Sequence, residues 1–248
     1  MVRDCVESSR SDRDILVLAV LDSKNSLTTK RTSPFDLDRP VLCLVIDRSC
    51  SVRPVLEAIE AAVAAGVDWL QIRERGCESG ELLSFAQDVH AAAERGANGR
   101  NVRVLVNRRV DIALATQAAG VHLGFDAMSP TDARTMLGGE AWIGTSAHST
   151  KDVEAAAQAG VDYVHLAPIL RPLSKAATRP ALGYAVLAEA ARLGVKVLAQ
   201  GGLEAQHCGD ALAAGATGIA VTGSILMSPD PGKAAAMLRS ALDTAAGG

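Results

Sequence analysis

The chain has 248 residues, of which 48% are hydrophobic, 21% are charged and only 3% are aromatic, and its formal net charge is −3. This length and composition suit a soluble globular protein of the size of an α/β barrel, and they exclude a wholly disordered chain. The acidic balance argues against broad binding of nucleic acid, but it leaves room for a local basic pocket that holds a small anion. Because aromatics are scarce, we expect a core built from Ala, Val, Leu and Ile.

The sequence shows no membrane or export signal. Its longest apolar run near the N-terminus, residues 15–21, is too short to span a bilayer, and it lacks the flanks of a signal peptide. The five cysteines are scattered without a C-x-x-C pair, which disfavours a disulfide framework or a structural zinc site. We therefore expect a cytoplasmic protein without nucleic-acid or membrane partners.

The composition divides the chain at about residue 40. Residues 1–39 are rich in Ser, Asp, Arg, Lys and Thr, and we interpret them as an N-terminal extension, peripheral or disordered, without a catalytic role. Residues 40–248 form one predicted domain, in which short apolar runs alternate with Ala-rich segments of helical period. The eight predicted strands are 41–46, 67–72, 102–106, 120–123, 141–144, 161–166, 195–199 and 218–221. The helical segments begin near Val52, Ser79, Arg109, Ser129, Lys151, Tyr184, Glu204 and Asp230.

This alternation predicts the fold. Strands that are each followed by a helix imply parallel βαβ units, and near-continuous apolar strands fit a sheet covered on both faces. Eight such units predict an α/β fold of the (β/α)8 TIM-barrel type, with an N-terminal extension. The rival is an open doubly wound sheet, which is the weaker interpretation because no G-x-G-x-x-G follows the first strand.

Two small-residue loops follow the last two predicted strands. They are Gly201-Gly202 and Thr222-Gly223-Ser224. In a TIM barrel the active site lies at the carboxyl ends of the strands, and the loops after strands seven and eight commonly bind phosphate through backbone N–H groups. The pair therefore predicts a phosphate site, and the alternative is a pair of plain tight turns.

Cations gather at the same predicted edge of the barrel, although the chain is acidic. They are Arg73, Arg75, Arg108, Arg109 and Lys175. Arginine binds phosphate oxygens bidentately, so this grouping suits a polyanion such as pyrophosphate. Alternatively, some of these side chains form ion pairs on the outside of the barrel, above all Arg109, which could begin a helix. Arg73 and Arg75 are one strand period apart, so we expect both to face inward.

Motifs for other chemistries are absent. No G-x-S-x-G or H-E-x-x-H occurs, and no Asp stands at an obvious spacing from His122 or His148. A Ser–His nucleophile is therefore disfavoured. His165 alternates with Val164 on a predicted strand and could point to the barrel interior or to the helices.

Residues from about 41 to 240 resemble the thiamine phosphate synthases and their relatives, the thiazole tautomerases. The matching segments occur in the family's order and near its spacing. They are 44–47, 71–75, 106–114, 120–124, 143–149, 162–164, 167–169, 174–175, 201–202 and 218–221. The resemblance implies a barrel that joins hydroxymethylpyrimidine pyrophosphate to thiazole phosphate. Pyrophosphate leaves, and the thiazole nitrogen captures a pyrimidine carbocation.

The resemblance also implies roles for residues of this chain. The predicted catalytic residues are Arg73, Arg75, Asn107, Ser146 and Lys175. The predicted substrate-binding residues are Gln71, Arg108, His122, Gly202, Thr222 and Gly223. Among these, Gln71 with Arg73, Arg75, Asn107 and Lys175 would hold the pyrimidine pyrophosphate, and Ser146 would lie near the pyrimidine or the leaving group. The loops at 202 and 222–223 would bind the thiazole phosphate.

The chain departs from the family at the implied Mg²⁺ ligands. Synthases have Asn-Asp-Arg where this chain has Asn107-Arg108-Arg109, and a second ligand Asp is expected at Ala127, while Asp126 stands one place early. Mg²⁺ is therefore an open cofactor, with Asp126 as its candidate ligand. Either Arg108 takes over part of the metal's charge role, or the chain does not ionise the pyrophosphate.

Three functions stay open at this point. A synthase is the first interpretation, and Gln71 is the residue that synthases carry. A thiazole tautomerase is the second, although the proposed acid–base His of that family aligns with Pro168 here. A non-catalytic protein that binds thiazole phosphate is the third. The expected partners are small phosphorylated substrates, and we allow for a homodimer.

Overall fold

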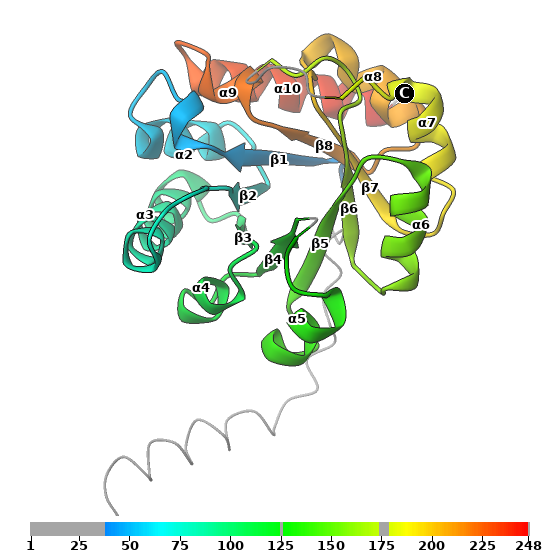
Figure 1. Cartoon of the computed structure of the whole chain (residues 1–248). Coiled ribbons are helices and arrows are strands. Elements are labelled where there is room, and N and C mark those ends of the chain that lie inside the picture. The colour runs from blue at the N-terminus through cyan, green and yellow to red at the C-terminus, as the bar shows by residue number, and fades with distance from the viewer. Residues whose placement is uncertain (1–37, 125, 174–178, 248) are drawn as a thin grey trace, which may run out of the picture. The chain divides into compact units, whose positions relative to one another are not determined.

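The computed structural model of the chain describes residues 38–124, 126–173 and 179–247. Within these ranges, eight parallel strands close into a barrel in which each strand pairs with its neighbours in sequence and β8 pairs with β1 (Figure 1). The strands are β1 (Val41–Ile46), β2 (Trp69–Ile72), β3 (Arg103–Asn107), β4 (Gly120–Leu123), β5 (Trp142–Ala147), β6 (Tyr163–Leu166), β7 (Lys196–Gln200) and β8 (Gly218–Val221). The predicted TIM barrel is confirmed, and every strand end lies within three residues of its predicted place.

Helices lie outside the ring of strands (Figure 1). They are α2 (Val55–Ala64), α3 (Ser79–Ala97), α4 (Val110–Ala115), α5 (Pro130–Leu137), α6 (Thr150–Gln158), α7 (Gly183–Ala190), α8 (Cys208–Ala213), α9 (Gly223–Leu226) and α10 (Pro231–Ala246), with short 3-10 helices η1 (Arg48–Cys50) and η2 (Ala205–His207). The sequence did not predict η1 or α9, which directly follow the ends of β1 and β8. Among the described residues, no helix is both long and apolar enough to cross a membrane.

The core has two layers because successive side chains of a strand point to opposite faces. Aliphatic residues such as Leu42 and Leu44 pack between strands and helices. The alternate residues fill the barrel interior, where the Trp69 ring centroid lies 5.3 Å from that of Trp142 and 5.2 Å from that of Tyr163. The expectation of a core built from Ala, Val, Leu and Ile therefore holds for the outer layer and for part of the interior. In the interior, three aromatic rings pack among smaller side chains, which are Val41, Cys43, Val45, Leu105, Leu198 and Ala220.

Gly144 makes room for one of these rings. It pairs with Tyr163 across β5 and β6, and a Cβ atom at position 144 would lie 2.1 Å from the Cζ atom of Tyr163. Any larger residue would push the tyrosine out of the interior. Gly144 thus fixes where the Tyr163 hydroxyl lies.

A buried ion pair ties the start of the barrel to its last helix. Asp68 accepts hydrogen bonds from the Leu42 backbone N–H at 2.9 Å and from Arg239 Nη1 at 3.0 Å. Arg239 also donates to the Pro40 carbonyl at 2.9 Å, and Arg39 Nη2 lies 2.6 Å from the same aspartate. Arg39, the last residue of the predicted extension, therefore already contacts the barrel. Residues 1–37 lie outside the described residues.

Replacing Asp68 by alanine removes the acceptor of the Leu42 N–H and of Arg239 Nη1, although Arg239 keeps a second carboxylate partner, Asp243, at 2.6 Å. We expect the free energy of unfolding to fall by about 2–3 kcal/mol, measured by chemical denaturation, because two buried donors would lose their acceptor. Glu60→Ala is the control, since it breaks an exposed ion pair with Arg95 and should change stability by at most about 1 kcal/mol. Equal effects of the two substitutions would contradict this account of Asp68.

Candidate active site

The inward-facing positions change character toward the carboxyl ends of the strands. On several strands an apolar side chain points into the barrel interior. The residue two positions later in the sequence points to the same side and is polar. For example, Trp69 is followed by Gln71 and Tyr163 by His165, both buried. This interior polar layer comprises Gln71, Asn107, His122, Ser146, His165 and Gln200. The strand period therefore builds an apolar barrel with a polar upper end, where TIM barrels hold their active sites.

A cavity of about 430 Å³ opens at this end of the barrel. Its lining includes six of the predicted site residues: Arg73, Arg75, Ser146, Gly202, Thr222 and Gly223. It also includes residues that the predicted set left out, among them Asp47, Cys50, His148, Arg179 and Gln200. The cavity thus brings together the loops that follow β1, β2, β7 and β8, as the predicted phosphate and pyrophosphate sites require.

The glycine loop after β7 is shaped by close backbone contact. Gly202 has a φ of +70°, and a Cβ atom there would lie 2.3 Å from the Arg171 carbonyl oxygen. Only glycine fits this position, because its backbone approaches the loop after β6 so closely. The hydroxyl of Ser224 donates to the Leu203 carbonyl, which ties the loops after β7 and β8 together. The two small-residue loops therefore form one wall of the cavity.

A second part of the cavity lining carries the two cations that follow β2, Arg73 and Arg75. Arg73 Nη1 lies 3.0 Å from Asp47 Oδ2, and the other carboxylate oxygen of Asp47 accepts a hydrogen bond from the Ser49 backbone N–H at 3.2 Å. Burial, followed by the charge of neighbouring Arg75, lowers the pKa of Arg73 from its usual value. Two neighbouring cations in the lining of one cavity favour an anionic ligand.

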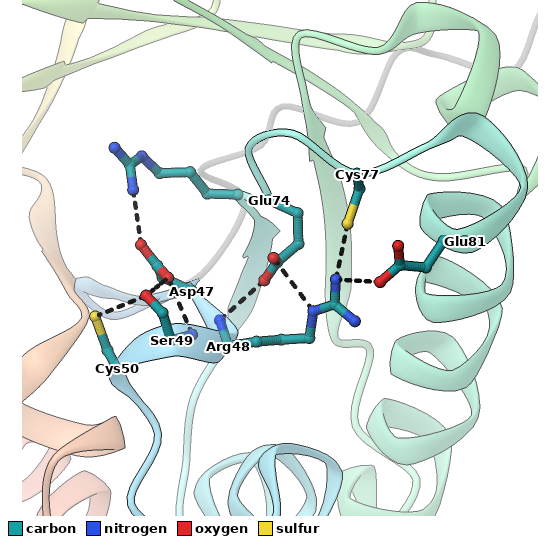
Figure 2. Close-up of polar contacts among 8 residues, drawn as sticks. Asp47, Arg48, Ser49, Cys50, Glu74, Cys77 and Glu81 are labelled. Atoms are coloured by element: carbon teal, nitrogen blue, oxygen red, sulfur yellow. Dashed lines mark hydrogen bonds and ion pairs between the residues drawn. The ribbon is translucent and has the colours of Figure 1, made fainter.

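The 3-10 helix η1 holds this part of the lining in place. Figure 2 shows Arg48 between Glu74, Cys77 and Glu81. Its backbone N–H donates to Glu74 Oε1 at 2.9 Å, and its guanidinium donates to Glu81 Oε1 at 2.8 Å and to Cys77 Sγ at 2.7 Å. Since Glu74 stands between Arg73 and Arg75 in the chain, Arg48 anchors the loop that presents both arginines to the cavity.

A buried hydrogen-bonded pair lies next to Ser146. His122, 1% exposed, places Nε2 2.9 Å from Ser146 Oγ and Nδ1 3.3 Å from the Tyr163 hydroxyl oxygen. Burial, with a smaller contribution from the charge of Arg73, lowers the pKa of His122 to about 3. The imidazole is therefore neutral near pH 7. His122 reaches the cavity through Ser146 rather than by lining it.

Several other predicted site residues do not line the cavity. Gln71 Nε2 donates to Asn107 Oδ1 at 3.3 Å, so both amides belong to the interior polar layer rather than to the cavity lining. Arg109 donates to Asp111 and to Ser79 Oγ on the outer side, which is the alternative that the sequence left open for it. Lys175 lies outside the described residues.

Sequence reasoning missed some lining residues for different reasons. Asp47 and Gln200 stand at the carboxyl ends of β1 and β7. This position by itself could have indicated that they belong to the site. His148 faces the cavity, with Nδ1 2.6 Å from the Ala167 carbonyl oxygen. Arg179 lies far along the loop after β6, and no pattern in the sequence marked it.

The fold and the cavity define a TIM-barrel protein whose mouth combines cationic side chains with two small-residue loops. A family profile described as thiamine monophosphate synthase matches residues 42–225, so the chain belongs to the thiamine monophosphate synthase family, whose members are transferases.

Individual relatives agree with this assignment. The thiamine-phosphate synthase of Xanthobacter autotrophicus is 36% identical over 212 residues, which cover 84% of this chain and 97% of that protein. The thiamine-phosphate synthase of Chlorobium phaeobacteroides is 34% identical over 194 residues, which cover 78% of this chain and 91% of that protein. The solved structure of thiamine phosphate pyrophosphorylase from Pyrococcus furiosus has the same fold, with a TM-score of 0.73 at 24% identity over 83% of this chain and 96% of that one.

The family uses Mg²⁺, but the described residues do not fit this ion. Arg108, a cation at an implied ligand position, places Nη1 2.7 Å from Asp126 Oδ1. The bond from Arg108 is the main cause that lowers the pKa of Asp126. Mg²⁺ needs several oxygen ligands in near-octahedral geometry, and the described residues contain no group of three or more His, Cys, Asp or Glu that could hold a metal. An ion pair therefore stands where the family implies carboxylates.

The low pKa of His122 predicts a pH dependence of stability. The unfolded chain takes up a proton at about pH 6.5, whereas the folded chain does so only at about pH 3, so this group's contribution is intact above pH 6.5 and falls as the pH drops. The loss is roughly 1.4 kcal/mol per pH unit in that window. We therefore expect the stability difference between wild type and His122→Gln to shrink from pH 7 to pH 5, measured by urea denaturation.

Ser146→Ala provides the control, because it removes the same hydrogen bond without removing a titrating group. Its destabilisation should be the same at both pH values. A His122→Gln difference that also stays constant would show that His122 titrates normally in the folded protein.

Proposed function

We propose that this chain is a thiamine-phosphate synthase that condenses hydroxymethylpyrimidine pyrophosphate with thiazole phosphate, releasing pyrophosphate. The observation that carries the proposal is the cavity, which joins Arg73 and Arg75 on one wall to the Gly202 and Thr222 loops on the other. Two phosphorylated substrates require two separate groups of residues that can bind anions. The family membership supports the same substrates.

Each wall has a separate task in this reaction. Arg73 and Arg75 bind the pyrophosphate and stabilise the negative charge that grows as it leaves. Gly202, Thr222 and Gly223 hold the thiazole phosphate through backbone N–H groups and a hydroxyl, which aims the thiazole nitrogen at the pyrimidine carbon. Ser146 contacts the pyrimidine or the departing pyrophosphate from the cavity floor. Lys175, Asn107 and Gln71 complete the proposed pyrimidine pyrophosphate site.

One feature of the described residues favours the tautomerase alternative, namely the lack of a full set of carboxylate ligands for Mg²⁺, which the tautomerases also lack. Position 168, where the tautomerases carry their proposed acid–base histidine, is a proline in the cavity lining and has no proton to transfer. The homodimer and the cytoplasmic location stay predictions of the sequence.

The test is a turnover assay with purified protein, hydroxymethylpyrimidine pyrophosphate and thiazole phosphate, read out as thiamine phosphate by chromatography. We expect product only when both substrates are present. Absence of product, together with thermal stabilisation by thiazole phosphate alone, would overturn the synthase proposal in favour of a binding protein.

Within this assay, Arg75→Ala should lower kcat/KM about tenfold to a hundredfold, because it removes a charge-assisted contact worth about 1.5–3 kcal/mol. Arg95→Ala is the matched control, since Arg95 pairs with Glu60 on the outer helices. Unchanged turnover in Arg75→Ala would remove this arginine from the proposed site.

The Arg108–Asp126 pair predicts the response to metal removal. Because a guanidinium occupies an implied ligand position, we expect turnover by the wild type to persist in chelator. Arg108→Asp restores the Asn-Asp-Arg pattern of the family and should make turnover dependent on added Mg²⁺. The positive φ of +66° at this position suits aspartate better than most residues. Loss of wild-type activity in chelator would show instead that Asp126 still serves a metal.

A further inference from the structure

Three side chains form a hydrogen-bonded series from the barrel interior to the cavity. The Tyr163 hydroxyl lies 3.3 Å from His122 Nδ1, and His122 Nε2 lies 2.9 Å from Ser146 Oγ. Tyr163 is 0% exposed and His122 is 1% exposed, whereas Ser146 lines the cavity. The series therefore has a buried end and an end that a substrate can touch.

The donor in each hydrogen bond of this series can be assigned from the groups that must keep a proton. The Tyr163 phenol keeps its proton, because burial raises its pKa well above the usual value. Among the described residues, His122 Nδ1 is the hydrogen-bond partner recorded for this hydroxyl. Because leaving a buried O–H without an acceptor is costly, the phenol donates to Nδ1. A neutral imidazole that accepts at Nδ1 carries its proton on Nε2.

This tautomer decides what Ser146 can do. Nε2–H donates to Ser146 Oγ, so the serine cannot use its own proton toward the histidine. The serine hydroxyl proton is then left to point into the cavity, toward an acceptor on a substrate. With the opposite tautomer, Ser146 would donate to Nε2 and would present only lone pairs to the cavity.

We propose that Tyr163 is a positioning residue, which fixes the tautomer of His122 and thereby turns Ser146 into a hydrogen-bond donor toward the substrate. The catalytic part of this inference rests on the proposed function, in which Ser146 contacts the pyrimidine or the leaving pyrophosphate. The tautomer itself does not depend on that function. Gly144 serves the same arrangement, since only glycine leaves space for the tyrosine ring.

The surroundings hold His122 in this neutral state. The His165 ring centroid lies 4.4 Å from that of His122, and both His165 nitrogens lack a hydrogen-bond partner among the described residues. No carboxylate is recorded in contact with either ring in the described part of the chain. Tyr163 is therefore the group that distinguishes Nδ1 from Nε2.

The first experiment reads the tautomer directly in the full-length chain. We would label the five histidines with ¹⁵N and assign the His122 signals with His122→Gln. In the wild type we expect His122 to carry its proton on Nε2, with Nδ1 at the resonance position of a hydrogen-bonded acceptor. In Tyr163→Phe the Nδ1 resonance should move to that of an unbonded nitrogen. A proton on Nδ1 in the wild type, or no movement in Tyr163→Phe, would overturn the proposal.

The chain supplies a matched control, because Tyr184 is its only other tyrosine. Tyr184→Phe should change neither the His122 resonances nor turnover. Ser146→Ala adds a second arm that does not disturb the aromatic interior. Because Tyr163 sets the tautomer, His122 should keep its proton on Nε2 in Ser146→Ala, and a shift of the proton to Nδ1 would contradict the proposal even if Tyr163→Phe fails to fold.

The second experiment asks whether the arrangement serves the reaction. In Tyr163→Phe we expect kcat to fall about tenfold with KM unchanged, because the ring still packs but the serine proton is no longer directed at the substrate. A normal kcat together with a changed Nδ1 resonance would overturn the positioning role. If the wild type forms no thiamine phosphate, the proposed function fails, while the resonances still decide the proton arrangement.

Discussion

The closure of the barrel by backbone hydrogen bonds between β1 and β8 is the constraint on which the site depends. These strands come from opposite ends of the described chain, and Leu44 pairs with Val221. Because all strands are parallel, closure brings every carboxyl end to one mouth. Asp47 and Thr222, which follow the two strands, therefore line the same cavity. An open sheet would leave them at opposite edges.

The two-residue period of the strands then decides what that mouth contains. The same inward face that carries Trp69 and Tyr163 in the lower barrel carries Gln71 and His165 above them. Burying these polar groups is costly unless they bond to one another or to a ligand. Gln71 Oε1 and both His165 nitrogens have no hydrogen-bond partner within the described residues. The interior polar layer therefore lowers stability. We expect such a cost where the end of the barrel binds polar substrates.

Ion pairs hold two of the cations near the carboxyl ends of the strands. Arg73, which lines the cavity, pairs with Asp47, whereas Arg108, which does not belong to the lining, pairs with Asp126. Arg48 anchors the loop between β2 and α3 through Glu74 and Glu81 (Figure 2). The Arg108–Asp126 pair also distinguishes this chain from the pattern of Mg²⁺ ligands that its family implies. The expected independence of turnover from Mg²⁺ depends on Arg108 alone.

The sequence by itself determined the barrel, because eight apolar runs alternating with helical segments leave few other folds. It also indicated the small-residue wall of the cavity, since Gly201-Gly202 and Thr222-Gly223-Ser224 are recognisable in the sequence after strands seven and eight. The tertiary structure alone decided which polar residues meet. The sequence gives no sign that Arg108 reaches Asp126, that Tyr163 reaches His122, or that Arg179 lines the cavity, because these contacts join different βα units. Local patterns fix each strand's inward face, but contacts between strands depend on register and barrel closure, which no local pattern encodes.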